Sequence, residues 1–312
     1  MKICFLGNHT VGATALRVLR RDADVVAVVA HPDDPEDGVR YLSVFAEARR
    51  MGIPVIRAAG KSPELEQLMD AAQPDLIWIT DYRYLVPVSV LHCARLGAVN
   101  LHPSLLPKYR GRAPINWAIL KGETQLGLTA HYVNEGADTG DIIAQRAFEL
   151  SQNHDVGDAL NRLYPLYEAM TAEVLAAFKS GLVPRRAQES KGASVFPRRT
   201  PEDGLIDWNE TATEVWNLIR AVAAPYPGAF SAWSDGVLRV WKAEAICALP
   251  SARRRKPGEI VSVSDDGSVL VVACRDAAII ITKFELEGSA APLVERGVLG
   301  LRIEPVAAGG RA

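Results

Sequence analysis

The first hundred residues alternate short apolar runs with a helical pattern, and this alternation leaves few folds open. Leu65, Leu68, Met69 and Ala72 have the i, i+3, i+4, i+7 spacing of a buried helix face. The apolar runs are rich in branched and aromatic side chains, as strands buried on both faces of a parallel sheet are; they span residues 2–6, 25–30, 75–80 and 98–101. The pattern predicts an α/β domain with helices on both faces of a parallel sheet, and ligands at the carboxyl ends of its strands.

Farther along the chain, a longer helical pattern is followed by short strand-like runs. Apolar residues keep three- and four-residue spacing from Val156 to Phe178, and Gly181 is the expected terminator. Pro165 inside this pattern is expected to kink or split the helix. After about residue 203 the chain becomes a series of short strand-like runs separated by turns, which span residues 229–233, 237–241, 258–263, 268–273 and 278–284.

These patterns predict two domains. A chain of 312 residues exceeds what one core usually serves, and 48% hydrophobic residues can fill two cores. We expect an N-terminal α/β domain over residues 1–203 and a smaller C-terminal β domain over residues 204–312. Five or six short strands imply a small barrel or a sandwich, and periodicity does not choose between them.

Two polar residues close the fourth apolar run. Asn100 and His102 are two positions apart, so on a strand they point to the same face. Asp138 follows in the stretch Asn134-Glu135-Gly136-Ala137-Asp138-Thr139-Gly140. An amide, an imidazole and a carboxylate at one point can stabilise an oxyanion, carry a proton and orient the proton carrier, which suits acyl-type transfer. The alternative is that Asn100 and His102 only satisfy backbone groups of a turn.

The surrounding residues extend this motif. Asn100-Leu101-His102-Pro103-Ser104-Leu105-Leu106-Pro107 leads into residues 104–117, and residues 127–131 and 138–142 follow. Together they resemble the signature of the 10-formyltetrahydrofolate-dependent formyltransferases, which include methionyl-tRNA formyltransferase and the sugar-nucleotide amine formyltransferases. The similarity continues through residues 196–208 and 220–230, and it extends to the formyltransferase domain that acts on UDP-4-amino-4-deoxy-L-arabinose. The resemblance implies a Rossmann-like catalytic domain followed by an OB-like β-barrel.

The resemblance also assigns roles to residues. In the family, the residue matching Asn100 stabilises the tetrahedral oxyanion, the one matching His102 moves the proton, and the one matching Asp138 holds and tunes the histidine. It further implies that the co-substrate 10-formyltetrahydrofolate is held by a loop, an arginine and a second loop; these match Tyr84, Leu85 and Val86, then Arg112, then Asn134, Glu135, Gly136 and Ala137.

The chemistry sets a requirement on His102. When an amine attacks the formyl carbon, its nitrogen becomes positive while the carbonyl oxygen becomes negative. His102 must be neutral to accept the proton, yet a nearby Asp138 carboxylate favours the imidazolium and raises the pKa of His102. We therefore expect the pKa of His102 to lie near neutrality.

The acceptor is argued from one loop. Family members that act on tRNA have a long, basic loop after the second strand, as capture of phosphates requires. Here residues 31–41 are short and acidic, and 35 basic side chains face 37 acidic ones over the whole chain, so no nucleic-acid or membrane partner is expected. We expect a nucleotide-linked 4-amino sugar, of the kind used in cell-surface polysaccharide or lipid A modification. Methionyl-tRNA is the alternative acceptor. A folate hydrolase and a catalytically silent binding module are further alternatives.

The remaining signals are weaker. Four scattered cysteines without a CxxC pair and a short apolar amino terminus indicate a cytoplasmic protein with reduced thiols. His131 and His154 could join His102 at a metal, but ordinary strand and loop histidines are favoured and no metal is expected. Residues 7–12 form a turn after the first strand that could touch a ligand, although a structural turn is favoured. Sugar-acting members of the family are often dimers, so the resemblance allows a homodimer.

Overall fold

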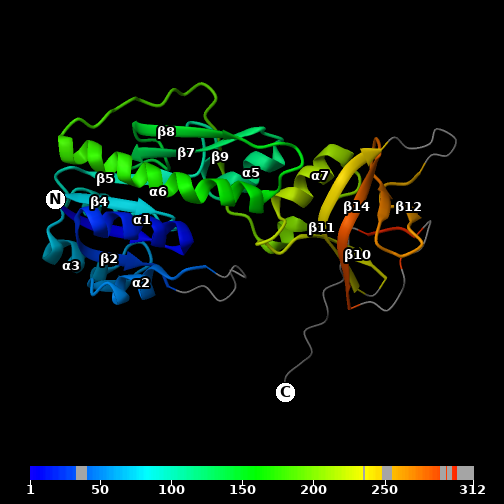
Figure 1. The fold of residues 1–312 in the computed structure, drawn as a ribbon, viewed down its shortest axis with the longest axis horizontal. Coiled ribbons are helices and arrows are strands. Elements are labelled where there is room, and N and C mark those ends of the chain that lie inside the picture. Colours follow the sequence, from blue (N-terminus) through cyan, green and yellow to red (C-terminus); the bar gives the residue numbers. More distant parts are fainter. Residues whose placement is uncertain (33–40, 235, 248–254, 289–292, 294–296, 301–312) are drawn as a thin grey trace, which may run out of the picture. The chain divides into compact units, whose positions relative to one another are not determined.

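The chain folds into two compact units (Figure 1). The computed structural model describes residues 1–32, 41–234, 236–247, 255–288, 293 and 297–300. The N-terminal unit comprises residues 1–115, 125–150 and 158–198, and the C-terminal unit comprises residues 116–124, 151–157 and 199–312. The domain boundary after residue 203 stays a prediction. Within the described residues, no helix is both long enough and apolar enough to cross a membrane.

A seven-stranded sheet forms the centre of the N-terminal unit, with the strand order β3-β2-β1-β4-β5-β7-β8. Neighbouring strands from β3 to β5 run parallel, whereas β7 is antiparallel to β5 and β8 is antiparallel to β7. The strands are β1 (Lys2–Gly7), β2 (Asp24–Ala30), β3 (Val55–Arg57), β4 (Leu76–Thr80), β5 (Ala98–His102), β7 (Gln125–Tyr132) and β8 (Ile142–Glu149). The predicted Rossmann-like parallel sheet is confirmed, and an antiparallel pair extends it.

The parallel strands are buried because both of their faces carry apolar side chains. On β1, Cys4 and Leu6 point into a core that they share with residues of α3 and α4, while Ile3 and Phe5 alternate to the opposite face and are equally buried. The helix predicted from Leu65 is α3, which Ser62 caps through its hydroxyl and which carries a proline in its first turn.

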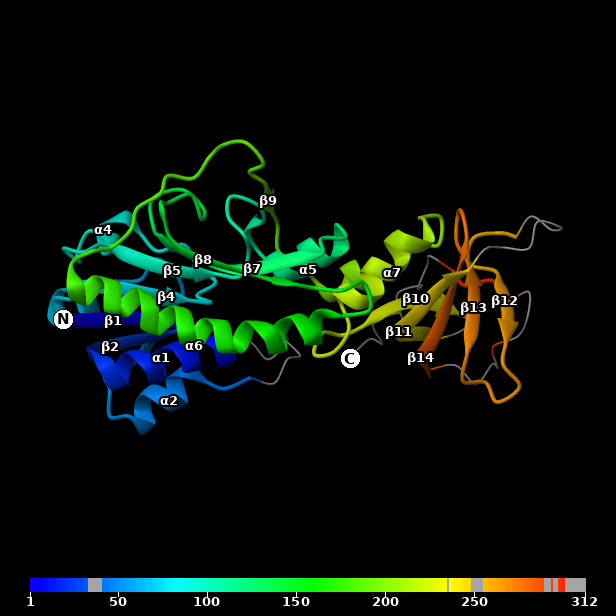
Figure 2. The same cartoon turned by 45° about the horizontal axis from the view of Figure 1, so that its top comes forward.

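The helices of this half of the chain are α1 (His9–Asp22), α2 (Val44–Arg50), α3 (Pro63–Ala72), α4 (Val88–Leu91), α5 (Pro114–Leu120) and α6 (Val156–Ser180). Figure 2 shows α6 as one long helix, and Pro165 lies inside it. Of the two predicted effects of Pro165, a split of the helix is therefore wrong, whereas a kink stays a prediction. Its buried stripe, which includes Leu163, Tyr167 and Met170, continues past the proline, and this packing holds the helix together.

The C-terminal unit is built around an antiparallel sheet with the strand order β10-β11-β14-β13-β12. Its elements are a 3-10 turn (Pro201–Gly204), α7 (Ala212–Ala221), β10 (Ala229–Trp233), β11 (Gly236–Cys247), β12 (Ile260–Val263), β13 (Leu270–Ala273) and β14 (Ala278–Glu287). Residues 297–300 hydrogen-bond to both edges of this sheet, since the Ile260 N–H donates to the Gly297 carbonyl and Ala232 exchanges bonds with Gly300. One segment thus joins the two edges, as a closed barrel requires. The predicted small β domain is confirmed, while its OB-like assignment stays a prediction.

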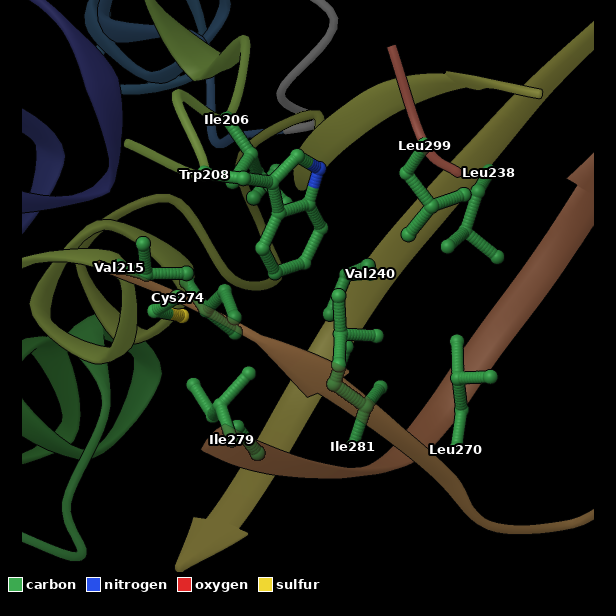
Figure 3. Packing of buried hydrophobic residues seen from close by; sticks show 14 of the residues in the cluster. Ile206, Trp208, Val215, Leu238, Val240, Leu270, Cys274, Ile279, Ile281 and Leu299 are labelled. Atoms are coloured by element: carbon green, nitrogen blue, oxygen red, sulfur yellow. The ribbon is translucent and has the colours of Figure 1, made fainter. Parts of the chain in front are cut away.

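The core of the C-terminal unit combines the inner face of this sheet with α7 and the chain before it (Figure 3). Trp208 is 2% exposed and lies beside Ile206, and Val215 contributes from α7. The indole N–H of Trp208 donates to the Ser231 hydroxyl at 3.0 Å, and that hydroxyl donates to the Gly300 carbonyl at 2.9 Å. Ser231 therefore links the core tryptophan to the segment that closes the sheet.

We predict that Ser231→Ala destabilises the C-terminal unit. The substitution leaves the buried Trp208 N–H without its acceptor and removes the bond to Gly300, which should cost about 1–3 kcal/mol in the free energy of unfolding. Urea unfolding followed by tryptophan fluorescence measures this. Ser262→Ala, on the half-buried face of β12, is the control and should change stability by less than about 0.5 kcal/mol. Equal stability of the two variants would contradict the role of Ser231.

Candidate active site

Strand β5 places the first two candidate residues on one face of the sheet. Asn100 and His102 are two positions apart on this strand, so their side chains point the same way. Antiparallel pairing with β7 sets His131 opposite Asn100 and Thr129 opposite His102, and directly opposed residues share a face. An amide and two imidazoles therefore gather at the carboxyl end of β5.

The loop between β7 and β8 brings Asp138 to the same point. Its Oδ1 accepts a hydrogen bond from Asn100 Nδ2 at 3.3 Å and lies 3.4 Å from His131 Nε2. Its Oδ2 accepts the Gly111 backbone N–H at 2.9 Å and lies 3.6 Å from His102 Nδ1. The structure thus brings together the three residues that the sequence singled out, around one carboxylate.

His102 is held by a backbone carbonyl as well as by the carboxylate. Its ring is buried, and Nε2 lies 2.8 Å from the carbonyl oxygen of Tyr109. A carbonyl oxygen only accepts, so Nε2 carries a proton and the neutral ring keeps its lone pair on Nδ1. The 3.6 Å between Nδ1 and Asp138 exceeds a direct hydrogen bond. The lone pair of His102 therefore lies on the side of Asp138 and Asn100.

The charges of this cluster shift two pKa values. Burial lowers the pKa of His102 below its ordinary value of 6.5, and the opposing effect of Asp138 is smaller. The sequence expectation placed this pKa near neutrality because it weighed the carboxylate without the burial. Burial raises the pKa of Asp138, but His102, His131 and the Gly111 N–H lower it by more. At neutral pH the site therefore holds an ionised Asp138 and a neutral His102.

A segment after α6 fixes the loop that carries Asp138. Gln188 donates from Nε2 to the carbonyl oxygens of Asp138 at 2.8 Å and Gly140 at 2.7 Å. Its Oε1 accepts two bonds from the Arg110 guanidinium, at 3.1 and 2.7 Å. Asp138 has φ 53°, a left-handed conformation that residues other than glycine rarely adopt. The bonds from Gln188 hold the backbone on both sides of this turn.

The same segment, residues 186–196, which we call the strap, also fixes Tyr109. The Tyr109 N–H donates to the Ser194 hydroxyl at 2.9 Å, and its ring stacks on Phe196 with centroids 5.2 Å apart. Next to it, strand β6 (Arg110–Gly111) pairs with β9 (Val195–Phe196). The strap therefore positions both the carbonyl that holds His102 and the N–H that holds Asp138.

The residues expected at folate lie around this site. Tyr84 and Leu85 follow β4 and are exposed, Leu85 by 80%, whereas Val86 packs against the core shared with α3 and α4. Arg112 donates to the Arg83 carbonyl oxygen. In the loop before Asp138, Asn134, Glu135, Gly136 and Ala137 are exposed; the Asn134 side chain accepts bonds from Gly136 N–H and the Thr139 hydroxyl. Their contact with folate stays a prediction.

A second polar group lies at the carboxyl ends of β1, β2 and β4. His9 Nδ1 lies 2.6 Å from the Asp81 carboxylate, and His9 Nε2 lies 2.6 Å from the Arg83 guanidinium. Asn8 and His31 are 5% and 3% exposed, and Asn8 Nδ2 and His31 Nε2 have no hydrogen-bond partner among the described residues. Buried polar atoms are normally paired, so these two atoms are candidate contacts for a polar ligand.

Arg112 connects the second group to the first. It follows Gly111, whose N–H holds Asp138, and its guanidinium contacts the carbonyl of Arg83. Burial lowers the pKa of Arg112, and the nearby charges of Arg83 and Arg198 lower it further. The charges of Arg83 and Arg198 therefore disfavour the charge of Arg112, an arrangement that an anionic ligand would stabilise.

Sequence reasoning missed several residues of this site. It weighed His131 as a metal ligand, and it weighed the turn after β1 without identifying His9 as a partner of Arg83. No sequence motif pointed to Gln188 or to the Tyr109 carbonyl. Among residues 1–32, 41–234 and the later described ranges, no cluster of three or more His, Cys, Asp or Glu side chains could hold a metal ion.

Solved structures with this fold include several formyltransferases. The chain is similar to the N-formyltransferase from Helicobacter canadensis in complex with folinic acid and dTDP-3-aminofucose, with 20% identity, TM-score 0.69, and 91% of this chain and 100% of that chain covered. For WlaRD, a sugar 3N-formyl transferase solved with dTDP and 5-N-formyl-THF, the identity is 17%, the TM-score 0.68 and the coverage 93% and 98%. For methionyl-tRNA formyltransferase from Clostridium thermocellum these values are 17%, 0.57, 93% and 100%.

Family comparison covers both units of the chain. The family described as "Formyl transferase" matches residues 1–175, which is more than half of the 312 residues. The family described as "Formyl transferase, C-terminal domain" matches residues 198–294. The first match contains β5, the loop with Asp138 and the turn after β1. The protein therefore belongs to the formyl transferase family.

Proposed function

We propose that the protein transfers the formyl group of 10-formyltetrahydrofolate to the primary amine of a nucleotide-linked amino sugar. The observation that carries this proposal is the meeting of Asn100, His102 and Asp138 around one carboxylate in a chain of the formyl transferase family. Each of the two charges that form in the transition state then has a partner in place.

Asn100 serves the developing oxyanion. When the amine attacks, the formyl carbonyl oxygen becomes negative, and a preorganised N–H donor stabilises it. Asn100 Nδ2 lies within hydrogen-bond distance of both Asp138 and His131, and one N–H placed between them can serve both. The second N–H of the same group is then available to the oxygen at the carboxyl end of β5.

His102 takes the proton that the attacking nitrogen loses. Because Nε2 is engaged with the Tyr109 carbonyl, the proton goes to Nδ1. The resulting imidazolium donates from Nε2 to that carbonyl and faces the Asp138 carboxylate with Nδ1, so the new positive charge lies beside an existing negative one. The ring then returns the proton to the tetrahydrofolate nitrogen as the carbon–nitrogen bond breaks.

The folate donor is supported by an exposed apolar surface beside the site. Tyr84, Leu85 and Val88 are large apolar residues, exposed by 39%, 80% and 37%, on the segment that follows β4. Exposed apolar side chains grouped beside polar catalytic residues are typical of sites for flat, partly apolar ligands. The similar structures that were solved with folinic acid or 5-N-formyl-THF support the same donor.

The nucleotide part of the acceptor is supported by the polar group at the ends of β1, β2 and β4. α1 begins there, and the first turn of a helix presents unpaired N–H groups that favour an anion. Arg83 and Arg112 add positive charge, while the buried Asn8 Nδ2 and His31 Nε2 offer a donor and an acceptor. A nucleotide-linked sugar has the phosphate and hydroxyl groups that such side chains bind.

The choice of a sugar over methionyl-tRNA also depends on the acidic loop after β2. Residues 33–40 of that loop lie outside the described residues, so this argument stays one of sequence. The homodimer, the 4-amino position of the sugar and its later use in polysaccharide or lipid A modification likewise stay predictions. The assay described next therefore includes methionyl-tRNA, the alternative acceptor.

We predict formyl transfer from 10-formyltetrahydrofolate to nucleotide-linked 4-amino sugars. Purified protein is incubated with a panel of such sugars, with 3-amino sugars and with methionine-charged initiator tRNA, and products are identified by mass spectrometry. Asn100→Ala should lower kcat by about a hundredfold to a thousandfold, as loss of an oxyanion donor does. Formyl on the tRNA alone would overturn the acceptor, and hydrolysis without transfer would overturn the function.

We predict that His102 titrates below pH 6.5 and that Asp138→Asn lowers its pKa further. Burial already lowers this pKa, and the Asp138 carboxylate is the larger of the two effects that oppose it, so removal of the charge leaves only the bond to the Tyr109 carbonyl against burial. The neutral ring should then persist to a lower pH in the variant than in the wild type. NMR titration of the imidazole carbon-bound protons measures both values. Asp141→Asn, in the same loop, should leave the titration unchanged, and a higher pKa in Asp138→Asn would contradict the analysis.

We predict that Arg83→Met weakens binding of the acceptor. The substitution removes the guanidinium beside His9 but keeps the backbone carbonyl that Arg112 contacts. Loss of a charged hydrogen bond to phosphate should raise KM for the nucleotide sugar by about 10- to 100-fold and leave KM for the folate unchanged. Arg185→Met, which removes the guanidinium stacked on Tyr132, is the control. A rise in the folate KM alone would assign Arg83 to the donor instead.

A further inference from the structure

His131 occupies a position from which it can control the amide of Asn100. It lies directly opposite Asn100 in the pairing of β5 with β7, and it is 1% exposed. Its Nε2 is 3.2 Å from Asn100 Nδ2 and 3.4 Å from Asp138 Oδ1. It also meets the ring of His102 edge-on, with centroids 6.3 Å apart. His131 thus contacts all three residues of the proposed catalytic group.

The other ring nitrogen determines how these contacts work. His131 Nδ1 lies 2.7 Å from the backbone carbonyl oxygen of Tyr132. Because that oxygen only accepts, Nδ1 carries the proton. In the neutral ring Nε2 then has a lone pair, and the atom of Asn100 that faces it must be a donor. The nitrogen end of the Asn100 amide is therefore the end that points toward His131 and Asp138.

The distances also allow one N–H of Asn100 to serve both acceptors. Asn100 Nδ2, His131 Nε2 and Asp138 Oδ1 form a nearly equilateral triangle with sides of 3.2, 3.3 and 3.4 Å. The two acceptors thus subtend about 60° at the amide nitrogen, whereas the two N–H bonds of a planar amide diverge by about 120°. One N–H directed between the two acceptors can therefore serve both, which leaves the second N–H pointing away from them.

We infer that His131 is a positioning residue that orients the Asn100 amide, so that its second N–H meets the oxyanion. The inference rests on the proposed function, because it takes Asn100 as the oxyanion donor. Without an acceptor at Nε2, the amide could turn its oxygen toward the substrate and repel the developing negative charge. Asp138 alone would then hold the amide, through one bond and with rotation left free.

Two variants of His131 separate this role from a merely structural one. In His131→Asn the side-chain amide can replace Nδ1 and keep the bond to the Tyr132 carbonyl, but nothing remains opposite Asn100. In His131→Gln the longer amide can reach the position of Nε2 and loses the bond to Tyr132. Each variant keeps one of the two contacts seen at His131. A structural role through Tyr132 favours the Asn variant, and positioning of Asn100 favours the Gln variant.

We expect His131→Asn to lower kcat by about 10- to 100-fold, as misplacement of a catalytic group does, with both KM values unchanged. His131→Gln should keep kcat within about threefold of the wild type. In an Asn100→Ala background, His131→Asn should cost less than about threefold more, because the group it positions is gone. Steady-state kinetics with the full chain, 10-formyltetrahydrofolate and the accepted amino sugar give kcat and both KM values for the wild type and each variant.

Several results would overturn the inference. The first is an unchanged kcat in His131→Asn. The second is a higher kcat in His131→Asn than in His131→Gln. The third is an equal fold loss of kcat from His131→Asn in the wild-type and the Asn100→Ala backgrounds. If Asn100→Ala itself leaves kcat unchanged, the proposed function loses its oxyanion donor and this inference fails with it. If Asn100→Ala lowers kcat and His131→Asn does not, the inference alone fails.

A measurement on the wild type tests the inference independently of how the variants fold. Nitrogen-15 NMR of the imidazole distinguishes a nitrogen that carries a proton from one with a lone pair. In the neutral ring we expect the proton of His131 on Nδ1 and a lone pair on Nε2. A proton on Nε2 would overturn the inference, because that nitrogen could then not accept from Asn100.

Discussion

The site depends on one carboxylate that is largely shielded from water. The Asp138 side chain is 16% exposed, and a charge in such a place has to be met by donors or by opposite charge. The donors come from separate elements: Asn100 from β5, Gly111 from β6 and His131 from β7. They converge because β7 runs antiparallel to β5 and opposes its residues one by one. The antiparallel direction of β7 relative to β5 thus brings residues of both strands to the same carboxylate.

The strands that could be predicted from the sequence are those whose burial produces a simple pattern of apolar residues. β1, β2, β4 and β5 are buried on both faces and read as apolar runs, and α3 shows its helical stripe. β3 has only three residues, too few to show a period. β7 is almost entirely buried but carries Thr129 and His131, so polar residues inside the strand concealed it. The polar positions that hid this strand are the ones that build the site.

The candidate site was predictable to the extent that residue types carry it. The spacing of Asn100 and His102 placed them on one face, and the resemblance supplied Asp138. The role of His131 requires the register between two strands about thirty residues apart, which no local pattern contains. The Tyr109 carbonyl could not be predicted either, since every residue has one. The downward shift of the His102 pKa could not be predicted either, because burial is a property of the folded chain and not of the motif.

The strap affects where a recombination point can be placed in chimeras of this protein with its relatives. The N-terminal family match ends at residue 175, yet the bonds that hold the Asp138 loop and Tyr109 come from Gln188 and Ser194. A recombination point placed at the end of the match would transfer all three candidate catalytic side chains and leave their support behind. Chimeras that keep residues up to 196 with the N-terminal unit retain these supporting bonds, and the structural module is therefore longer than the family match to residues 1–175.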